Sequence, residues 1–395
     1  MSPSLRPLDG VTVVSLEHAI AAPLCTRHLA DLGARVIKVE RPGRGDFARD
    51  YDSRVRGLAS HFVWVNRSKE SLTLDLKQPA ARAVLIDLLA GADVLVQNLA
   101  PGAAARLGLA FEALQPAHPR LIVCDISGYG NDGPYRDRKA YDLLIQSEAG
   151  FLSVTGTPEA AAKAGAPVAD IAAGMYAYSS VLAALLQRGR TGQGGHIDVS
   201  MLEALTEWMG YPLYYAFEGA APPPRSGAAH ATIAPYGPFA TADGTVMLGV
   251  QNEREWQAFC AQVLRQPSLA TDARFASGAQ RNAHRAELQA AIAAVFSALR
   301  SAEVLQRLEL AQIANASVND MAGVWAHPQL AARRRWRTVD SPAGPLHALL
   351  PPGVSSSFEP RMDAVPAIGE HTDAILRALG RSDADIALLR QAGAI

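Results

Sequence analysis

Short apolar runs alternate with helical patterns through the first half of the chain. The predicted strands cover residues 11–16, 35–40, 72–76, 93–97, 121–126 and 196–199, and the predicted helices cover about 22–32, 78–91, 140–150 and 170–187. Strands that alternate with helices in this way pair in parallel and are buried on both faces. The pattern therefore predicts an α/β fold whose large domain holds a doubly wound, Rossmann-like parallel sheet. Ligands of such sheets bind outside the carboxyl ends of the strands.

A proline-rich interruption follows the sixth predicted strand. Three consecutive prolines, Pro222 to Pro224, indicate a linker near 220–226. The pair Asp243-Gly244 lies between two apolar runs and predicts a β-hairpin over 236–250. The helices predicted in this half are 201–218, 253–265, 283–298 and 302–311. We expect the elements after the linker to form a smaller α+β domain over residues 225–330.

A second passage rich in proline and glycine, at 341–353, marks the return of the chain to the large domain. The large domain is therefore predicted to comprise residues 1–220 plus 335–395. Two short helices, at 368–380 and 383–392, are expected near the end of the sequence. A length of 395 residues exceeds what one ordinary core holds, which agrees with two domains.

The charge and cysteine content argue against several classes of protein. A net charge of −1 and a pI near 6.8 give no reason to expect nucleic acid or an anionic membrane as a partner. Cys25, Cys124 and Cys260 lie far apart and form no CxxC pair, so we predict neither a zinc site nor a disulfide framework. This cysteine usage fits a reducing cytoplasm. The Ala-rich stretch 172–186 is interpreted as a buried core helix, too short and too polar to span a bilayer.

The usual nucleotide-binding motifs are missing. After the first predicted strand the chain reads Glu17-His18-Ala19-Ile20-Ala21, without a GxGxxG sequence, and the chain contains no Walker A motif. Because both motifs cradle phosphates with backbone N–H groups, their absence makes an ordinary NAD or ATP site a weak interpretation.

A lone carboxylate, Asp170, stands in a small and apolar segment after Pro167. We predict that it is the N-cap of the helix that follows, and that the helix dipole keeps it ionised. An anionic carboxylate in such surroundings is also what a carboxylate nucleophile requires. This segment alone leaves both interpretations open, a plain N-cap and a nucleophile.

A series of short motifs, in order and spacing, resembles the family III CoA-transferases, which include formyl-CoA, carnitine and several dicarboxylate CoA-transferases. The motifs lie at residues 7–11, 32–46, 66–69, 74–77, 96–102, 106–108, 127–130, 141–144 and 191–194. The resemblance extends over nearly the whole chain. It implies an interlocked homodimer, in which CoA lies across the large domain near the small domain of the partner subunit.

By this resemblance Asp170 aligns with the catalytic aspartate of the family. The implied reaction moves CoA from a donor thioester to an acceptor carboxylate through an aspartyl anhydride and an aspartyl-CoA thioester. The energy of the thioester is conserved throughout, so we expect no ATP, no metal and no permanently bound cofactor, with the CoA thioester itself as substrate. Covalent catalysis of this kind divides one difficult step into easier ones.

The resemblance also implies contacts with CoA. Cationic side chains are expected to hold its phosphates, and a polar side chain its diphosphate. The matching residues are Arg41, Lys77, Arg106 and Lys139 for the phosphates, Asn98 for the diphosphate, Leu74 for the adenine, and His18 and Ala19 for the pantetheine arm. For each cation the alternative is a solvated surface side chain, and for His18 it is a hydrogen-bonded core histidine.

The choice of substrate is expected to depend on two segments. Residues 49–56 contribute the candidates Arg49 and Arg54, and a cation there would hold the second carboxylate of a dicarboxylic acid. In the second segment, His230 is a further candidate, and Gly227 is expected to offer backbone N–H groups to an oxyanion. The four-glycine run of formyl-CoA transferase is missing there, so the segment looks like the branch that uses succinyl-CoA with itaconate, mesaconate, malate or citramalate.

Other functions remain as alternatives. One is intramolecular CoA transfer within a C5 dicarboxyl-CoA, and another is a CoA-binding protein without catalysis. A third is a 2-methylacyl-CoA racemase, which needs two acid/base groups on opposite faces of the α-carbon. The racemases carry a histidine where this chain has Tyr141, and a tyrosine with a pKa near 10 is a poor replacement. This departure favours the transferase.

Overall fold

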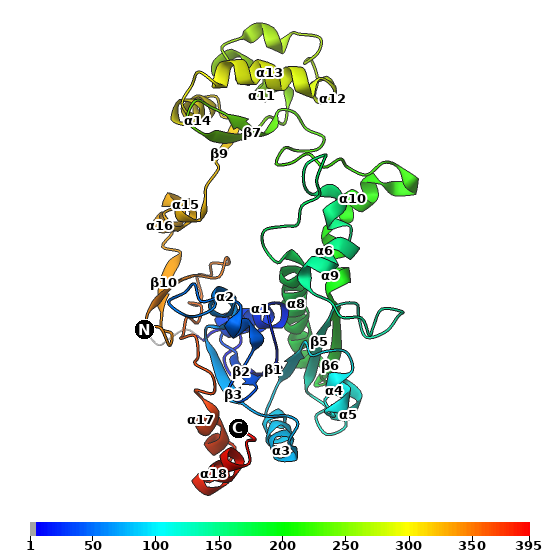
Figure 1. Ribbon diagram of the computed structural model, residues 1–395, viewed down its shortest axis with the longest axis vertical. Helices are drawn as coiled ribbons and strands as arrows, with labels where there is room; N and C mark the ends of the chain where they lie inside the picture. Colours follow the sequence, from blue (N-terminus) through cyan, green and yellow to red (C-terminus); the bar gives the residue numbers. More distant parts are fainter. Residues whose placement is uncertain (1–4) are drawn as a thin grey trace. The chain divides into compact units, whose positions relative to one another are not determined.

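The predicted alternation builds a six-stranded parallel sheet with the order β3-β2-β1-β4-β5-β6 (Figure 1). The computed structural model describes residues 5–395. The strands are β1 (Thr12–Leu16), β2 (Arg35–Glu40), β3 (Lys69–Thr73), β4 (Val94–Gln97), β5 (Ile122–Ser127) and β6 (Gly195–Ser200). The strand order reverses between β1 and β4, and the carboxyl edge at such a reversal is where sheets of this kind bind their ligands. The predicted α/β class with a parallel sheet is confirmed.

The chain divides into two compact units. The large unit contains the residues up to Gly150, then Ala164–Met209 and Leu330–Ile395. The small unit contains Phe151–Lys163 and Gly210–Gln329. The large unit is thus built from three stretches of chain, with the small unit inserted between them.

Helices of the large unit connect and cover the strands. They are α1 (Ala21–Asp31), η1 (Phe47–Asp50), α2 (Ser60–Asn66), α3 (Pro79–Leu89), α4 (Ala103–Arg106), α5 (Phe111–Leu114), α6 (Asp142–Glu148), α8 (Val168–Thr191), α9 (Met201–Trp208), α17 (Thr372–Ala378) and α18 (Asp383–Gln391). A two-stranded antiparallel sheet, β10 (Trp336–Val339) with β11 (Leu346–Leu349), belongs to the same unit. The core between β1 to β5 and the helices α3 and α17 consists mainly of leucine and valine.

Strand β3 begins three residues earlier than the predicted 72–76 and ends at Thr73. Its first residue, Lys69, is buried because its ammonium group is 2.7 Å from the Glu17 carboxylate. A pattern of apolar residues cannot reveal a strand that begins with a buried ion pair, so the prediction followed the leucines at positions 72, 74 and 76 instead.

Helix α8 packs against α1, and the contact is close at Gly174. A Cβ atom built on Gly174 would lie 2.6 Å from the carbonyl oxygen of Ala21 and 3.2 Å from Cβ of Leu24. Only glycine allows the two helix backbones this separation, because any side chain would overlap the carbonyl oxygen.

Helix α8 is longer and more apolar than predicted. It has 24 residues with a mean hydropathy of 1.4 in its most apolar window, which is enough to cross a membrane, so the expectation that it is too short and too polar is wrong. One third of that window is buried, so α8 is only in part the buried core helix that was predicted. Near its end, Arg188 is buried and donates to the carboxylate of Asp93 at 2.8 Å, which ties the helix to the start of β4. The expected absence of a membrane partner stays a prediction.

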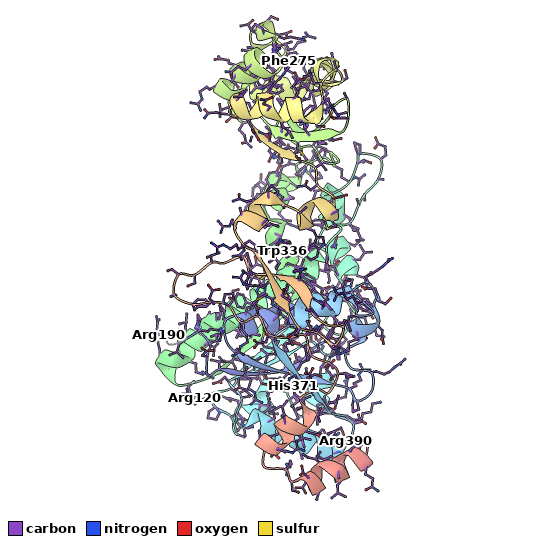
Figure 2. All side chains as sticks on the ribbon, turned by 90° about the vertical axis from the view of Figure 1, so that its left-hand side faces the viewer. Arg120, Arg190, Phe275, Trp336, His371 and Arg390 are labelled. Atoms are coloured by element: carbon purple, nitrogen blue, oxygen red, sulfur yellow. The ribbon has the colours of Figure 1, made fainter. Side chains whose placement is uncertain are left out.

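The C-terminal segment returns to the outer edge of β3. The imidazole Nδ1 of His371 accepts from the backbone N–H of Ser71 (3.2 Å), and Oγ1 of Thr372 accepts from the N–H of Thr73 (3.0 Å). Figure 2 labels His371 where this segment meets the sheet, with Arg390 further along on α18. The edge strand therefore has its N–H groups satisfied by residues about 300 positions later in the chain.

The small unit has its own antiparallel sheet and core. Its sheet is β7 (Tyr236–Ala240), β8 (Thr245–Gly249) and β9 (Ala314–Ser317), so the hairpin predicted around Asp243-Gly244 is confirmed. Its helices are α7 (Phe151–Val154), α10 (Gly210–Tyr215), η2 (Phe217–Gly219), α11 (Glu253–Ala258), the π-helix η3 (Phe259–Val263), η4 (Pro267–Ala270), α12 (Gly278–Ala283), α13 (Arg285–Phe296), α14 (Ser301–Leu310) and α15 (Met321–Trp325). Helix α16 (Pro328–Ala332) spans the boundary of the two units. Trp256 and Phe275 meet edge to face in the core of this unit, with ring centroids 6.2 Å apart. Figure 2 labels Phe275.

The single helix predicted for 201–218 is wrong. Helix α9 ends at Trp208 in the large unit, and α10 begins at Gly210 in the small unit. Gly210 weakens a helix by about 1 kcal/mol relative to alanine, and Pro212 lacks the N–H that would continue the ladder from α9. The apolar pattern runs across both helices, but these two residues separate them.

Candidate active site

The turn between β1 and α1 lies at the carboxyl edge of the sheet, where the strand order reverses. The side chain of Asn98, at the end of β4, forms two hydrogen bonds with the backbone of this turn. Its Oδ1 accepts from the His18 N–H (2.8 Å) and its Nδ2 donates to the His18 carbonyl (2.9 Å). Ala19 adopts a left-handed conformation with φ of 60°, which is uncommon for a residue with a side chain. The chain then enters α1 at Ala21.

Asp170 lies in the first turn of α8, as its third residue. The N-cap position is held by Pro167, so the prediction that Asp170 caps this helix is wrong. A different carboxylate does the capping. Oδ1 of Asp142, the first residue of α6, accepts from the backbone N–H groups of Ala169 (2.8 Å) and Asp170 (3.3 Å). The side chain of Asp170 therefore does not cap its own helix, and it is available for other contacts.

Gln146 holds Asp142 in place. The fully buried Gln146 donates from Nε2 to Oδ2 of Asp142 (2.6 Å) and accepts at Oε1 from the N–H of Ala164 (3.0 Å). The two residues are one helical turn apart on α6, so the pair is preorganised by the helix itself. Nothing in the sequence pointed to Gln146.

The carboxyl group of Asp170 is half-buried and has one hydrogen bond, from the backbone N–H of Ala21 at the start of α1. Burial raises the pKa of Asp170 to about 7, and the nearby negative charge of Asp142 acts in the same direction. The Ala21 N–H opposes this shift without cancelling it. The effects of burial and of the Asp142 charge on the pKa of Asp170 thus outweigh that of the helix dipole, which was expected to keep Asp170 ionised. A carboxylate with a raised pKa is more basic, and it is a better nucleophile than an ordinary aspartate once it has lost its proton.

Aromatic side chains surround the approach to Asp170. Phe47 and Tyr51 are more than 40% exposed and their ring centroids are 5.7 Å apart. Burial, together with the negative charges of Asp46 and Asp170, raises the pKa of the Tyr51 hydroxyl to about 12. Tyr51 therefore stays protonated and can donate a hydrogen bond near Asp170. Sequence reasoning selected the arginines of this segment and missed these two rings, although their spacing of four residues was visible.

His18 and Arg41 lie close together at the same edge. The imidazole ring of His18 stacks on Phe47 at 5.3 Å. Burial lowers the pKa of His18, and the positive charges of Lys38 and Arg41 contribute to this shift, whereas Asp46 opposes it. A neutral His18, an exposed Arg41 and the amide of Asn98 therefore meet beside the turn. This is the cluster that the resemblance assigns to the pantetheine arm and the phosphates of CoA.

The remaining residues predicted to bind CoA differ in their surroundings. Lys77, Arg106 and Lys139 are exposed on loops or short helices of the large unit. The guanidinium of Arg106 donates to the nearby carbonyl of Pro101 at 3.5 Å. Leu74 is 2% exposed and lies in the core of the large unit. Its contact with adenine stays a prediction that this burial does not support.

Arg49 and Arg54, the two arginines predicted to bind substrate, behave differently. Arg49 forms a two-pronged ion pair with the buried Glu40, at 2.9 and 2.7 Å, and its guanidinium lies 3.7 Å above the ring of Phe62. This arginine is therefore engaged within the large unit. Arg54 is exposed, and only its backbone N–H has a partner in the part of the chain that the structure covers, the carboxylate of Asp52 (2.9 Å).

Gly227 and His230 belong to the small unit. The N–H of Gly227 donates to the carbonyl of Gly156 at 2.7 Å, so this N–H is engaged and is not available to an oxyanion. His230 stacks on Tyr236 at 5.2 Å, and its Nδ1 accepts from the N–H groups of Thr232 and Ile233. Since Nδ1 is an acceptor, the proton of the neutral ring is on Nε2. His230 can therefore offer one donor to a ligand.

Within residues 5–395, no group of three or more His, Cys, Asp or Glu side chains is arranged to hold a metal ion. Cys25, Cys124 and Cys260 are buried and unpaired.

Comparisons with known proteins agree with the geometry. Residues 8–372 match the family described as CoA-transferase family III. A succinyl-CoA:glutarate CoA-transferase from Mus musculus is 32% identical, over 96% of this chain and 88% of its own length. An acetyl-CoA:oxalate CoA-transferase from Acetobacter aceti is 36% identical, over 83% of this chain and 84% of its own length. The crystal structure of a CAIB/BAIF family protein from Brucella suis superimposes with a TM-score of 0.85 at 34% identity, over 95% of this chain and 99% of that one.

Proposed function

The chain belongs to CoA-transferase family III and is a CoA-transferase, and from this premise we propose that it moves CoA from succinyl-CoA to a C4 or C5 dicarboxylate. The observation that carries the proposal is the Asp170 carboxyl group. It is half-buried, has a pKa near 7 and accepts one backbone hydrogen bond, and across residues 5–395 no cation forms an ion pair with it. A carboxylate locked in an ion pair could not act as a nucleophile, whereas this one can.

Asp170 would act in two half-reactions. Its carboxylate attacks the carbonyl carbon of succinyl-CoA, the C–S bond breaks, and a succinyl-aspartyl anhydride and CoA thiolate result. The thiolate then attacks the aspartyl carbonyl, which releases succinate and leaves an aspartyl-CoA thioester. The acceptor carboxylate repeats these steps in reverse order, so that CoA leaves on the new acid and Asp170 is restored. No proton is lost or gained over the cycle, because each step exchanges one anion for another.

The choice of acids is supported by relatives whose names pair succinyl-CoA with a C4 or C5 dicarboxylate. Itaconate, mesaconate, malate and citramalate are the proposed acceptors, and glutarate joins them. Intramolecular transfer within one C5 dicarboxyl-CoA uses the same steps and stays the nearest alternative. A racemase is less favoured, because Tyr141 is 66% exposed and replaces the histidine that such enzymes use.

The CoA molecule would lie along the carboxyl edge of the sheet. Arg41, Lys77, Arg106 and Lys139 are proposed to neutralise its phosphates. His18, Ala19 and Asn98 would border its pantetheine arm and diphosphate, as the turn that they form ends at the Ala21 N–H beside Asp170. The CoA thioester enters as substrate, and the expected absence of a permanently bound cofactor stays a prediction.

An interlocked homodimer and a cytoplasmic location are proposed alongside. The partial burial of α8, one third of its most apolar window, supports a partner that covers its open face. Three buried and unpaired cysteines support a reducing compartment. Light scattering that gives the mass of a monomer would overturn the dimer, and recovery of the protein from a membrane or periplasmic fraction would overturn the location.

The function is tested by a panel of acids. The purified protein is incubated with succinyl-CoA and, separately, with itaconate, mesaconate, malate, citramalate, glutarate and oxalate, and new thioesters are identified by mass spectrometry. We expect thioesters of the C4 and C5 acids, at rates well above those without enzyme. Transfer to oxalate alone, or to no acid, would contradict the proposal. Wash-in of deuterium at the α-carbon of a 2-methylacyl-CoA would point to a racemase instead.

Arg54 is proposed to hold the second carboxylate of the acceptor, and Arg49 provides a matched control. Replacing Arg54 with alanine is expected to raise KM for the acid about tenfold or more while KM for succinyl-CoA changes less than about twofold, since one charge-assisted contact contributes about 1.5–3 kcal/mol. The Arg49→Ala variant should instead lose thermal stability, because it leaves the buried Glu40 without its ion pair. Initial rates at varied acid and varied succinyl-CoA check this, and equal changes in both KM values for Arg54→Ala would refute the assignment. His230→Ala serves as a second candidate in the same assay.

A further inference from the structure

Four charged side chains are buried together beneath the turn that joins β1 to α1. They are Glu17, Lys38, Asp46 and Lys69, all between 0% and 3% exposed, and we call them the buried charge cluster. The ammonium group of Lys38 is 2.8 Å from Asp46 and 3.4 Å from Glu17, and that of Lys69 is 2.7 Å from Glu17. Two carboxylates balance two ammonium groups. Such a cluster is costly to build, since removing one partner leaves a buried charge unpaired at a cost of about 3–5 kcal/mol.

The buried charge cluster also holds the backbone around it. The carboxylate Oδ1 of Asp46 accepts from the N–H of Ala19 (3.2 Å), and the same oxygen accepts from the N–H of Ala48 (2.9 Å). Lys69 donates to the carbonyl of Pro23 (2.9 Å) in the first turn of α1. The cluster therefore forms hydrogen bonds with both the turn and the start of the helix that follows it.

Ala19 needs this support because of its backbone conformation. Its φ of 60° lies in the left-handed region, which costs about 1 kcal/mol or more for a residue with a side chain. Two residues later the chain presents the N–H of Ala21 to the carboxyl group of Asp170. The carbonyl of Ala21 meanwhile packs against Gly174 of α8. A turn that left the left-handed region would move Ala21 relative to Asp170.

We propose that Asp46 is a positioning residue for Asp170: it holds the left-handed turn at Ala19, with Lys38 as its counter-charge, and so fixes the Ala21 N–H against the Asp170 carboxyl group. The inference rests on the catalytic role proposed for Asp170. Asp46 itself acts through the turn and does not take part in the chemistry.

An asparagine cannot replace Asp46 in this role. One carboxylate oxygen accepts from two backbone N–H groups and the other accepts from Lys38, so both must be acceptors. In either orientation the amide NH₂ of asparagine would face a donor, at the turn or at Lys38. Asp46→Asn therefore weakens the hold on the turn with almost no change in volume.

The test follows the titration of Asp170 in two ways. The first is the acidic limb of the pH profile of kcat/KM, and the second is a ¹³C NMR titration of labelled aspartate carboxyls, in which Asp170 is assigned by comparison with Asp170→Asn. Because the Ala21 N–H lowers the pKa of Asp170, its displacement in Asp46→Asn should raise that pKa by about one unit. The acidic limb should move to higher pH by the same amount, while KM for succinyl-CoA changes less than kcat. Asp142 and Tyr51, whose electrostatic interactions with Asp170 bear on its titration, are unaltered in this variant.

A cycle of variants separates positioning from general damage. Glycine adopts the left-handed conformation without steric cost, so in the Ala19→Gly background the shift caused by Asp46→Asn should fall to half or less. Thr73→Val is the matched control, because it removes a buried hydrogen bond to Thr372 at the outer edge of the sheet, away from Asp46 and the turn. Its titration should be that of the unmodified protein.

A second variant, Ala19→Val, tests the same turn. If Asp46→Asn does not fold, Ala19→Val leaves the buried charge cluster intact but disfavours the left-handed conformation, and it should shift the titration in the same direction. An unmoved titration in either folded variant, or an equal shift in Thr73→Val, would overturn the proposal. The NMR titration needs no turnover, so its outcome stays separate from a failure of the protein to transfer CoA.

Discussion

Replacing Asp170 with asparagine is expected to abolish CoA transfer while the fold is retained. Asparagine has the same shape and can still accept from the Ala21 N–H, but its amide oxygen does not attack a thioester. We expect kcat to fall about a thousandfold or more, as for other enzymes that lose a covalent nucleophile. The measurement is the rate of new thioester formation from succinyl-CoA, together with circular dichroism to confirm the fold. A loss of less than about tenfold would count against the nucleophilic role.

The same substitution should alter how stability depends on pH. The pKa of Asp170 is raised to about 7 in the folded protein, above its value in the unfolded chain, so the folded state holds this proton more tightly. The stabilisation is complete at pH values below about 4 and is lost as the pH rises toward 7. In Asp170→Asn, this loss of stability with rising pH should be absent. The Tm of the variant minus the Tm of the unmodified protein should therefore increase between pH 5 and pH 8. Asp142→Asn removes the neighbouring charge, and its amide NH₂ would also face a donor at Gln146 or at the start of α8. The decline should therefore shrink without vanishing, whereas equal pH dependence in all three proteins would contradict the raised pKa.

Gly174→Ala is expected to damage both stability and activity, against the trend of helix propensity. Within a helix, alanine is favoured over glycine by about 1 kcal/mol. At this position, however, the new methyl group would lie 2.6 Å from the Ala21 carbonyl oxygen. Overpacking of this kind costs about 1–3 kcal/mol, and the backbone of Ala21 must move away from α8. Because Ala21 also carries the N–H that contacts Asp170, we expect kcat to fall about tenfold to a hundredfold.

Gly189 provides the matched control for that variant. It lies on the same helix, it is exposed, and a Cβ atom built on it would meet nothing within 4 Å. Gly189→Ala should therefore leave activity unchanged and raise the free energy of unfolding by up to about 1 kcal/mol. Denaturant unfolding and steady-state rates of both variants make the comparison. Similar behaviour of the two would show that the close contact between α1 and α8 does not matter.

Apolar strands that alternate with helices were well predicted from the sequence. The predicted 35–40 coincides with β2, and the predicted hairpin around Asp243-Gly244 is found between β7 and β8. Such elements are specified by local patterns of burial and turn residues. Errors arose where a partner distant in sequence decides the outcome. The start of β3 depends on an ion pair between Lys69 and Glu17, and no local pattern shows it.

In the candidate site, too, local patterns were predicted well and partners that are distant in sequence were not. Asp170 was identified from its own segment, because an isolated carboxylate among small apolar residues is conspicuous there. Its role as an N-cap was mispredicted, since the capping group is Asp142, 28 residues earlier in the chain. Arg49 was chosen for its charge, but the burial of Glu40 beside it could not be foreseen from spacing. The pairing of buried charges is a tertiary property, and it decides which charged residues are available to a ligand.

The return of the C-terminal segment to β3 has a consequence for biosynthesis. The first 150 residues leave the ribosome with most of the sheet but without the residues that satisfy the N–H groups of Ser71 and Thr73. Until His371 and Thr372 have been translated, β3 is an unpaired edge strand, with which a strand of another nascent chain can pair. We therefore expect the large unit to complete its folding only after synthesis of the chain is nearly finished.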